Sequence, residues 1–274
     1  MRVDLNIPYI PDSRRDPFRE FDLYLPSDAS TTGTLVCFIH GGAWRTEDKK
    51  DHAVLAEKLV RHTGLAVAVP NYRLTLDMQD PPVRHPLHAK DILQFLEFLL
   101  TRVGPSGMGR AVDPTKLFLM GHSCSAHMLS SIFLDSSAVT PVLTPSSALL
   151  HAVQGIVFSE GIYDLDLLCS RFPSYLDWFV AAAFEKLETY AAFTVTNYAL
   201  RRPNIRWLLI HSQGDTLIDK PQTEKMLKHL KDQYGTSADE YIHYDTSLIQ
   251  GHDAILVEDE FVQIVERFIQ KALI

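Results

Sequence analysis

The chain has 274 residues, of which 46% are hydrophobic, so it is long enough to bury one large core as a single domain over 1–274. Its 26 basic and 34 acidic residues give a formal net charge of −8, and this acidic balance argues against nucleic acid as a partner. The odd number of cysteines (three) and the charged N-terminus predict a cytoplasmic protein. No apolar run approaches the roughly 18 residues of a membrane span, so we expect no membrane contact.

Strands and helices alternate along the sequence, beginning with an edge-like antiparallel strand at 21–25. The later apolar stretches predict strands at 35–39, 65–69, 117–120, 155–158, 206–211 and 241–244. Amphipathic patterns predict helices at 51–62, 86–102, 124–134, 221–233 and 254–274. This alternation predicts an α/β fold with a mostly parallel sheet flanked by helices, and a ligand site outside the carboxyl ends of the strands.

The strand at 35–39 ends in the loop His40-Gly41-Gly42-Ala43-Trp44. Paired glycines after a strand let the backbone approach a ligand and point N–H groups at it. The N–H groups of Gly41 and Gly42 are therefore candidate oxyanion donors, and a plain glycine turn is the alternative. His40 is interpreted as a residue that fixes the loop by hydrogen bonding, not as a catalytic base.

A serine lies between a strand and a helix in Gly121-His122-Ser123-Cys124-Ser125. On such a sharp turn the hydroxyl of Ser123 is exposed as a nucleophile, and the N–H of Cys124 is free to complete the oxyanion hole. The usual pattern ends in glycine, where Ser125 stands here. The alternative is that Ser123 simply caps the helix.

The segment at 164–202 interrupts the alternation of strands and helices. It contains eight aromatic residues without a strand pattern, namely Phe172, Tyr175, Trp178, Phe179, Phe184, Tyr190, Phe193 and Tyr198. Because it is inserted between two sheet strands, we expect a small helical cap over the site, within the single domain. The alternative for most of these rings is that they pack the cap onto the body.

Two further residues complete a candidate catalytic set. Asp215 lies in a turn beyond the strand at 206–211, although turn aspartates are common. His252 follows Gly251 after the last strand, and Asp253 beside it is interpreted as the cap of the terminal helix. The order serine, aspartate, histidine predicts a triad in which His252 is the general base for Ser123 and Asp215 orients the imidazole. No histidine cluster indicates a metal, so neither metal nor cofactor is expected.

With these motifs in place, the chain resembles the fungal-type kynurenine formamidases (arylformamidases) of the hormone-sensitive-lipase-like branch of α/β-hydrolases. The segments that carry the resemblance follow the strands, at 40–44, 72–74, 121–123, 160–165, 211–215 and 251–253. The resemblance implies an α/β-hydrolase fold and hydrolysis of N-formyl-L-kynurenine to L-kynurenine and formate, without a cofactor. That reaction belongs to tryptophan degradation and NAD biosynthesis.

An aromatic leaving group suits a pocket of aromatic side chains, for which Trp44, Tyr163 and Trp178 are the candidates. The expected partner is a small-molecule substrate, and a homodimer is left open. Two other functions remain open at this point. One is a carboxylesterase that uses the same triad on short-chain acyl esters, and the other is a non-catalytic hydrolase-fold binding protein.

Overall fold

The structure is a computed structural model that describes residues 1–10, 15–27, 34–102 and 116–273. Within these residues, eight strands form one sheet in the order β1-β2-β4-β3-β5-β6-β7-β8. Their bounds are β1 Arg2–Pro8, β2 Glu20–Leu25, β3 Leu35–Ile39, β4 Ala66–Pro70, β5 Leu117–His122, β6 Val153–Ser159, β7 Arg206–Ile210 and β8 Ile242–Asp245. The strands from β4 across to β8 pair in parallel, which confirms the predicted α/β fold with a mostly parallel sheet.

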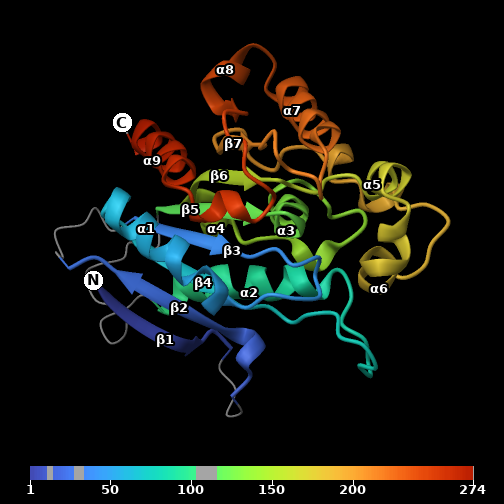
Figure 1. Cartoon of the computed structure of the whole chain (residues 1–274), viewed down its shortest axis with the longest axis horizontal. Helices are drawn as coiled ribbons and strands as arrows, with labels where there is room; N and C mark the ends of the chain where they lie inside the picture. Colours follow the sequence, from blue (N-terminus) through green and yellow to red (C-terminus); the bar gives the residue numbers. More distant parts are fainter. Residues whose placement is uncertain (11–14, 28–33, 103–115, 274) are drawn as a thin grey trace.

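Helices cover both faces of this sheet (Figure 1). On one face, α1 (Ala53–Thr63) packs beside α9 (Asp259–Leu273). On the other face lie α2 (Leu87–Arg102), α3 (Cys124–Phe133) and α7 (Lys220–Tyr234). The shorter helices are α4 (Ser147–Ala152), α5 (Leu165–Arg171), α6 (Ala181–Phe184) and α8 (Ala238–Tyr241).

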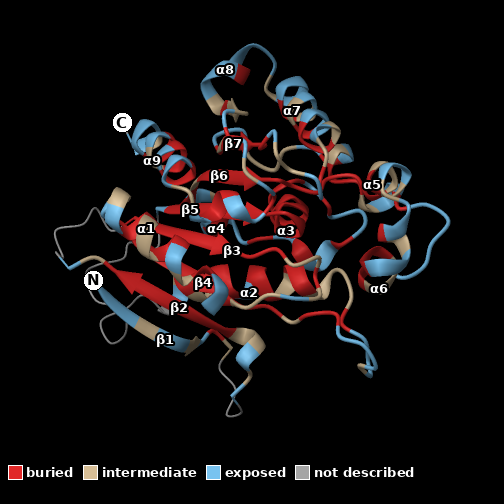
Figure 2. Cartoon of the chain, viewed as in Figure 1, coloured by how far each residue is buried: buried red, intermediate tan, exposed pale blue. Residues whose placement is uncertain are grey.

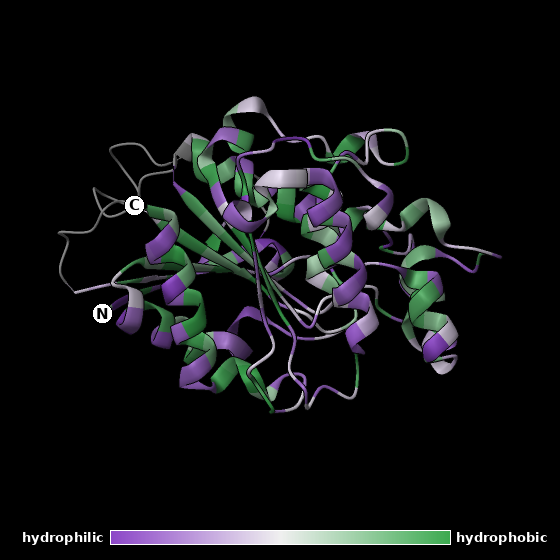
Figure 3. Cartoon of the chain, turned by 90° about the horizontal axis from the view of Figure 1, so that it is seen from above, coloured by the Kyte–Doolittle hydropathy of each residue, from purple (hydrophilic) through white to green (hydrophobic). Residues whose placement is uncertain are grey.

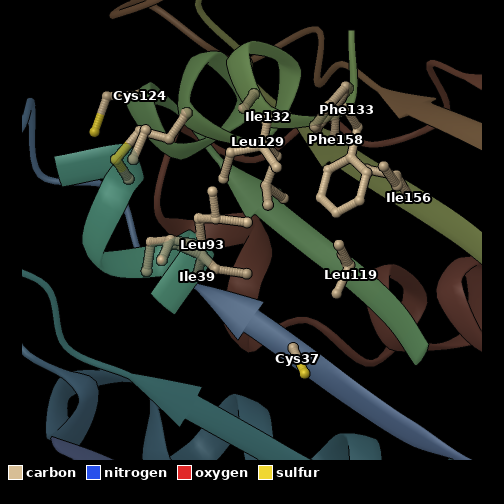
Figure 4. Packing of buried hydrophobic residues seen from close by; sticks show 14 of the residues in the cluster. Cys37, Ile39, Leu93, Leu119, Cys124, Leu129, Ile132, Phe133, Ile156 and Phe158 are labelled. Atoms are coloured by element: carbon tan, nitrogen blue, oxygen red, sulfur yellow. The ribbon is translucent and has the colours of Figure 1, made fainter. Parts of the chain in front are cut away.

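The helices pack onto the sheet through two hydrophobic cores, one on each face. There are two cores because successive side chains of a strand point to opposite faces. In β3, Val36 and Phe38 belong to the core under α1 and α9, whereas Cys37 and Ile39 belong to the core under α2 and α3. Figure 4 shows the second core, with Leu129 of α3 among its members. The central strands are buried throughout, and they are mostly hydrophobic between helices of mixed polarity (Figures 2 and 3).

Two sequence predictions about elements are wrong. The strand at 21–25 is not an edge, because β1 pairs with its outer side; its Asp22 is buried and forms an ion pair of 3.0 Å with Lys49. The helix predicted at 254–274 is broken, since Glu258 has extended backbone (φ −82°, ψ 138°). A 3₁₀ turn over Ala254–Val257 therefore precedes α9, and residue 274 lies outside the described residues. In the described part of the chain, every helix is too short or too polar to cross a membrane.

Between β6 and β7 the chain forms short helical pieces instead of another strand. They include α5, a π-helical turn at Leu176–Val180 and α6. Figure 1 places α5 and α6 beyond the carboxyl ends of the parallel strands, where a site on such a sheet is expected. We keep the name cap segment for residues 164–202.

Candidate active site

Ser123 is held on a sharp turn between β5 and α3. Its backbone has φ 56° and ψ −122°, a conformation that side-chain-bearing residues rarely adopt and that costs about 1–3 kcal/mol. The side chain makes no capping hydrogen bond to α3, so the helix-cap alternative is wrong. Ser123 instead lines a cavity of about 220 Å³.

Small side chains allow this turn to pack closely. A Cβ atom on Gly121 would lie 3.0 Å from Leu129 Cδ1 and 3.1 Å from the backbone nitrogen of Ala126. Ser125, which stands where the usual pattern has glycine, is fully buried and donates hydrogen bonds to the carbonyls of Ile39 (2.7 Å) and His122 (2.8 Å). Its hydroxyl is therefore satisfied, and serine fits this position without leaving a buried polar group unpaired.

The glycine loop crosses directly over Ser123. A Cβ atom on Gly41 would lie 3.1 Å from Ser123 Cβ, so this position admits little more than glycine. Gly42 has φ 83°, and a Cβ there would lie 2.3 Å from the carbonyl oxygen of Thr46. Gly42 also lines the cavity with Ser123, so its backbone is at hand for an oxyanion.

The thiol of Cys124 lies outside the cavity lining and contacts the glycine loop. The N–H of Trp44 donates to its sulfur at 3.3 Å, and the N–H of Ala43 also contacts it. Burial raises the pKa of this thiol to about 12, so it stays protonated and cannot compete with Ser123 as a nucleophile.

His40 fixes the base of the same loop. Its ring stacks on Tyr72 at 4.4 Å, and its Nδ1 lies 3.2 Å from the carbonyl oxygen of Gly41, which also accepts the Tyr72 hydroxyl at 2.7 Å. Burial lowers the pKa of His40 to about 4, so the ring is neutral at physiological pH. These contacts agree with a loop-fixing role for His40.

Asp215 and His252, which the chain order predicted to act together, are in hydrogen-bond contact. Nδ1 of His252 lies 2.7 Å from Oδ2 of Asp215, while the other carboxylate oxygen accepts the N–H groups of Leu217 (2.8 Å) and Ile218 (3.1 Å). Burial opposes ionisation of Asp215, but the hydrogen bond and charge of His252 outweigh it and lower the Asp215 pKa to about 2. His252 lines the cavity together with Ser123, and its Nε2 lies 4.0 Å from Oδ1 of Asp253.

A second carboxyl group, that of Glu160, contacts Asp215. It is fully buried at the end of β6, and its Oε1 accepts the N–H of Ser212 at 2.8 Å. Burial and the hydrogen bond with Asp215 raise the pKa of Glu160 to about 9. Sequence reasoning included this residue in a motif but gave it no role. The only signal was a glutamate directly before Gly161 at a strand end.

Two other carboxylates line the cavity wall. Asp253 does not cap a helix as predicted; its side chain accepts a hydrogen bond of 3.2 Å from Nε2 of His122, which lowers the pKa of Asp253. Glu47 lies 2.9 Å from Nε2 of His52; burial opposes its ionisation, but this contact prevails and lowers its pKa. Both groups are therefore anionic at neutral pH, and no motif in the sequence pointed to Glu47.

The opposite wall of the cavity is apolar and comes largely from the cap segment. Tyr175, Trp178 and Phe179 line it, with Trp178 as predicted. Two other predicted pocket residues, Trp44 and Tyr163, are fully buried and lie outside the lining. The ring of Trp44 packs against Phe184 at 5.1 Å and that of Tyr163 against Phe158 at 5.7 Å, so both serve the core.

Three groups of ligand-type side chains in the described residues are close enough to share a metal ion. They are His40, Glu47 and His52; His122, His252 and Asp253; and Glu160, His211 and Asp215. Each group already contains a close pair of donor atoms, namely His52–Glu47 (2.9 Å), His122–Asp253 (3.2 Å) and His211–Glu160 (3.2 Å). The expectation of no metal stays a prediction.

The chain is similar in sequence to known proteins. The family described as BD-FAE matches residues 21–230. The kynurenine formamidase of Meyerozyma guilliermondii is 30% identical over 206 residues, covering 72% of this chain and 71% of that protein. A kynurenine formamidase-like hydrolase of Fusarium equiseti is 29% identical over 209 residues, covering 67% of this chain and 65% of that protein.

A solved structure gives the same fold. Esterase B from Lactobacillus rhamnosis has a TM-score of 0.74 at 18% identity, with 99% of this chain and 84% of that chain covered. At that identity the likeness speaks for the α/β-hydrolase fold alone.

Proposed function

This chain belongs to the BD-FAE family and is a relative of the fungal kynurenine formamidases; from this premise we propose that it is a serine hydrolase whose catalytic residues are Ser123, Asp215 and His252. Hydrolase activity is what the family and its esterase-like fold support. The observation that carries the assignment to these residues is that Ser123 and His252 line one cavity while His252 is bound to an ionised Asp215 at 2.7 Å.

The proposed mechanism uses these groups in sequence. Ser123 Oγ attacks the substrate carbonyl carbon while its proton passes to Nε2 of His252, and Asp215 stabilises the resulting imidazolium. The oxyanion is bound by backbone N–H groups of Gly41, Gly42 and Cys124; each such donor lowers the barrier by about 2.7–4 kcal/mol. His252 then protonates the leaving group, the acyl bond breaks, and water repeats the attack on the acyl-serine to restore Ser123.

The substrate we propose is N-formyl-L-kynurenine, cleaved to L-kynurenine and formate. A cavity of about 220 Å³ is smaller than the roughly 300–1,000 Å³ of pockets for drug-sized ligands, which favours a small acyl group and a one-ring leaving group. The rings of Tyr175, Trp178 and Phe179 suit the anilide portion. This reaction assigns the protein to tryptophan degradation towards NAD, in the cytoplasm.

The test is the steady-state rate of the purified protein on N-formyl-L-kynurenine, followed by kynurenine absorbance, beside Ser123→Ala. We expect kcat/KM above roughly 10⁴ M⁻¹s⁻¹, lost in the variant. A negligible rate on this substrate with brisk hydrolysis of p-nitrophenyl acetate would replace the formamidase assignment by that of a carboxylesterase.

A further inference from the structure

Glu160 lies between the two turns that carry catalytic groups. Its own N–H donates to the carbonyl of Ile210 at the end of β7 (3.2 Å), and the carbonyl of the preceding Ser159 accepts the N–H of Ser123 (2.9 Å). Two residues later, Ile162 N–H donates to the carbonyl of Ser123 (3.2 Å). The end of β6 therefore ties the nucleophile turn to the acid turn.

The backbone at Glu160 is held in an uncommon conformation. Its φ is 52°, although a residue with a side chain rarely adopts that region outside functional or strongly constrained sites. Gly161 beside it has no room for a side chain, because a Cβ there would lie 2.2 Å from the hydroxyl oxygen of Tyr163. This packing fixes Glu160 where its carboxyl reaches the turn after β7.

The two oxygens of the Glu160 carboxyl differ in their contacts. Oε1 accepts the N–H of Ser212 (2.8 Å), whereas Oε2 is buried without a hydrogen-bond partner among the described residues, 3.2 Å from Nδ1 of His211, and the group lies against Asp215. The titratable groups that face it are Asp215 and His211 after β7, Tyr163 on its own segment and Tyr244 on β8. Two touching, buried carboxyls cannot both ionise without a large cost.

The environment decides which of the two carboxyls keeps the proton. Asp215 is stabilised as an anion by His252 and by two backbone N–H groups. Glu160 is fully buried and has no lysine or arginine among its described contacts. A hydrogen bond between them thus has Glu160 as the donor and Asp215 as the acceptor.

We propose that Glu160 is a positioning residue that, as a neutral acid, donates a hydrogen bond to Asp215 and so holds the carboxylate against Nδ1 of His252. This inference rests on the proposed function, because Asp215 matters to catalysis only if His252 is the base for Ser123. Glu160 does not line the cavity, so it acts on the reaction through Asp215. Losing it leaves substrate binding intact and slows the chemical step.

Two substitutions separate a hydrogen-bond donor from a charge. Glu160→Ala removes the donor, and we expect kcat on p-nitrophenyl acetate to fall about 10–100-fold with KM within about twofold. Glu160→Gln keeps the shape and can still donate to Asp215 through its amide N–H₂, so we expect kcat within a few fold of wild type. Glu20→Gln is the matched control, since Glu20 is also buried but pairs with Arg15 at 2.7 Å and should leave kcat unchanged.

A folded alanine variant with unchanged kcat would overturn the proposal, and so would a glutamine variant as slow as alanine. If Glu160→Ala does not fold, the proposal is tested by comparing how the stabilities of wild type and Glu160→Gln depend on pH. Burial raises the Glu160 pKa to about 9 in the folded chain, whereas an unfolded glutamate titrates near about 4.3. Wild type therefore loses stability as pH rises between these two values, and the glutamine variant does not.

We accordingly expect the Tm of Glu160→Gln, measured relative to wild type, to be higher at pH 8 than at pH 5. A constant difference would show that Glu160 is already ionised when folded and would overturn the proposal. Failure of the proposed function has a different signature. In that case wild type itself neither turns over p-nitrophenyl acetate nor reacts with a fluorophosphonate probe, whatever residue 160 is.

Discussion

The two walls of the cavity are built in different ways. On the sheet side, each group is fixed by short directed bonds, such as His252–Asp215 at 2.7 Å, and by the uncommon backbone of Ser123. On the cap side, the wall consists of rings that contact one another, for example Tyr175 and Phe179 at 5.1 Å. Directed bonds fix the sheet-side groups in place, whereas rings in tilted and edge-on contact offer apolar area. Changes on the sheet side should therefore lower kcat, and changes on the cap side should raise KM.

The largest effect is expected from Ser123→Ala. Removing the nucleophile should lower kcat by on the order of 10⁶ and abolish labelling by a fluorophosphonate probe. The fold should persist, because the Ser123 side chain makes no capping bond to α3. The control is Ser130→Ala on the same helix, whose buried hydroxyl has no hydrogen-bond partner among the described residues, so labelling should stay. Wild type that is never labelled would instead indicate a non-catalytic binding protein.

A smaller loss is expected from Asp215→Asn. The amide can present an N–H to Nδ1 and so favour the wrong tautomer of His252, which should cost on the order of 10⁴ in kcat with little change in KM. Asp219→Asn and Asp245→Asn are matched controls, because Asp219 pairs with Arg171 and Asp245 bonds to Ser247 at 2.7 Å. If either control lost as much kcat as Asp215→Asn, the acid would be assigned to the wrong aspartate.

On the cap side, Trp178→Ala should act on binding. The ring lines the cavity although 52% of the residue is exposed, so its removal takes away contact area without unfolding the core. We expect KM for N-formyl-L-kynurenine to rise roughly tenfold, with kcat on p-nitrophenyl acetate unchanged. Leu187→Ala, which is 39% exposed in the same segment but outside the lining, should change neither. A drop in kcat on both substrates would mean that the cap also positions the catalytic groups.

The difference between the walls also explains what the sequence could predict. Ser123, Asp215 and His252 each follow a strand with a motif of fixed order, so local pattern and topology suffice to find them. The contacts of Glu160 are made with partners that lie far away in the sequence, such as Ser212, and no local pattern reports such contacts.

The errors have a similar cause. Trp44 follows the glycine loop and Asp253 precedes a helical turn, yet one packs into the core and the other bonds to His122. In the cap segment, composition predicts aromatic helices but cannot say which rings face the cavity, because that depends on how short helices dock.

The smallest effect is expected from the two carboxylates at the rim of the sheet-side wall. Glu47 and Asp253 are anionic and line the cavity, so they should favour a substrate that carries an ammonium group, as the amino-acid portion of N-formyl-L-kynurenine does. In Glu47→Gln we expect KM for that substrate to rise about fivefold, because a partly solvated ion pair contributes up to about 1 kcal/mol. KM for neutral N-formylaniline should stay constant.

Asp77→Asn is the control for this last comparison, since Asp77 is an exposed carboxylate that pairs with Arg45 at 2.5 Å and lies outside the lining. Adding salt should weaken the preference for the ammonium substrate in wild type and leave Glu47→Gln less affected, because screening acts on the charge that the variant lacks. An equal rise in KM for both substrates would instead mean that Glu47 shapes the glycine loop, through its contact with His52, and does not sense charge.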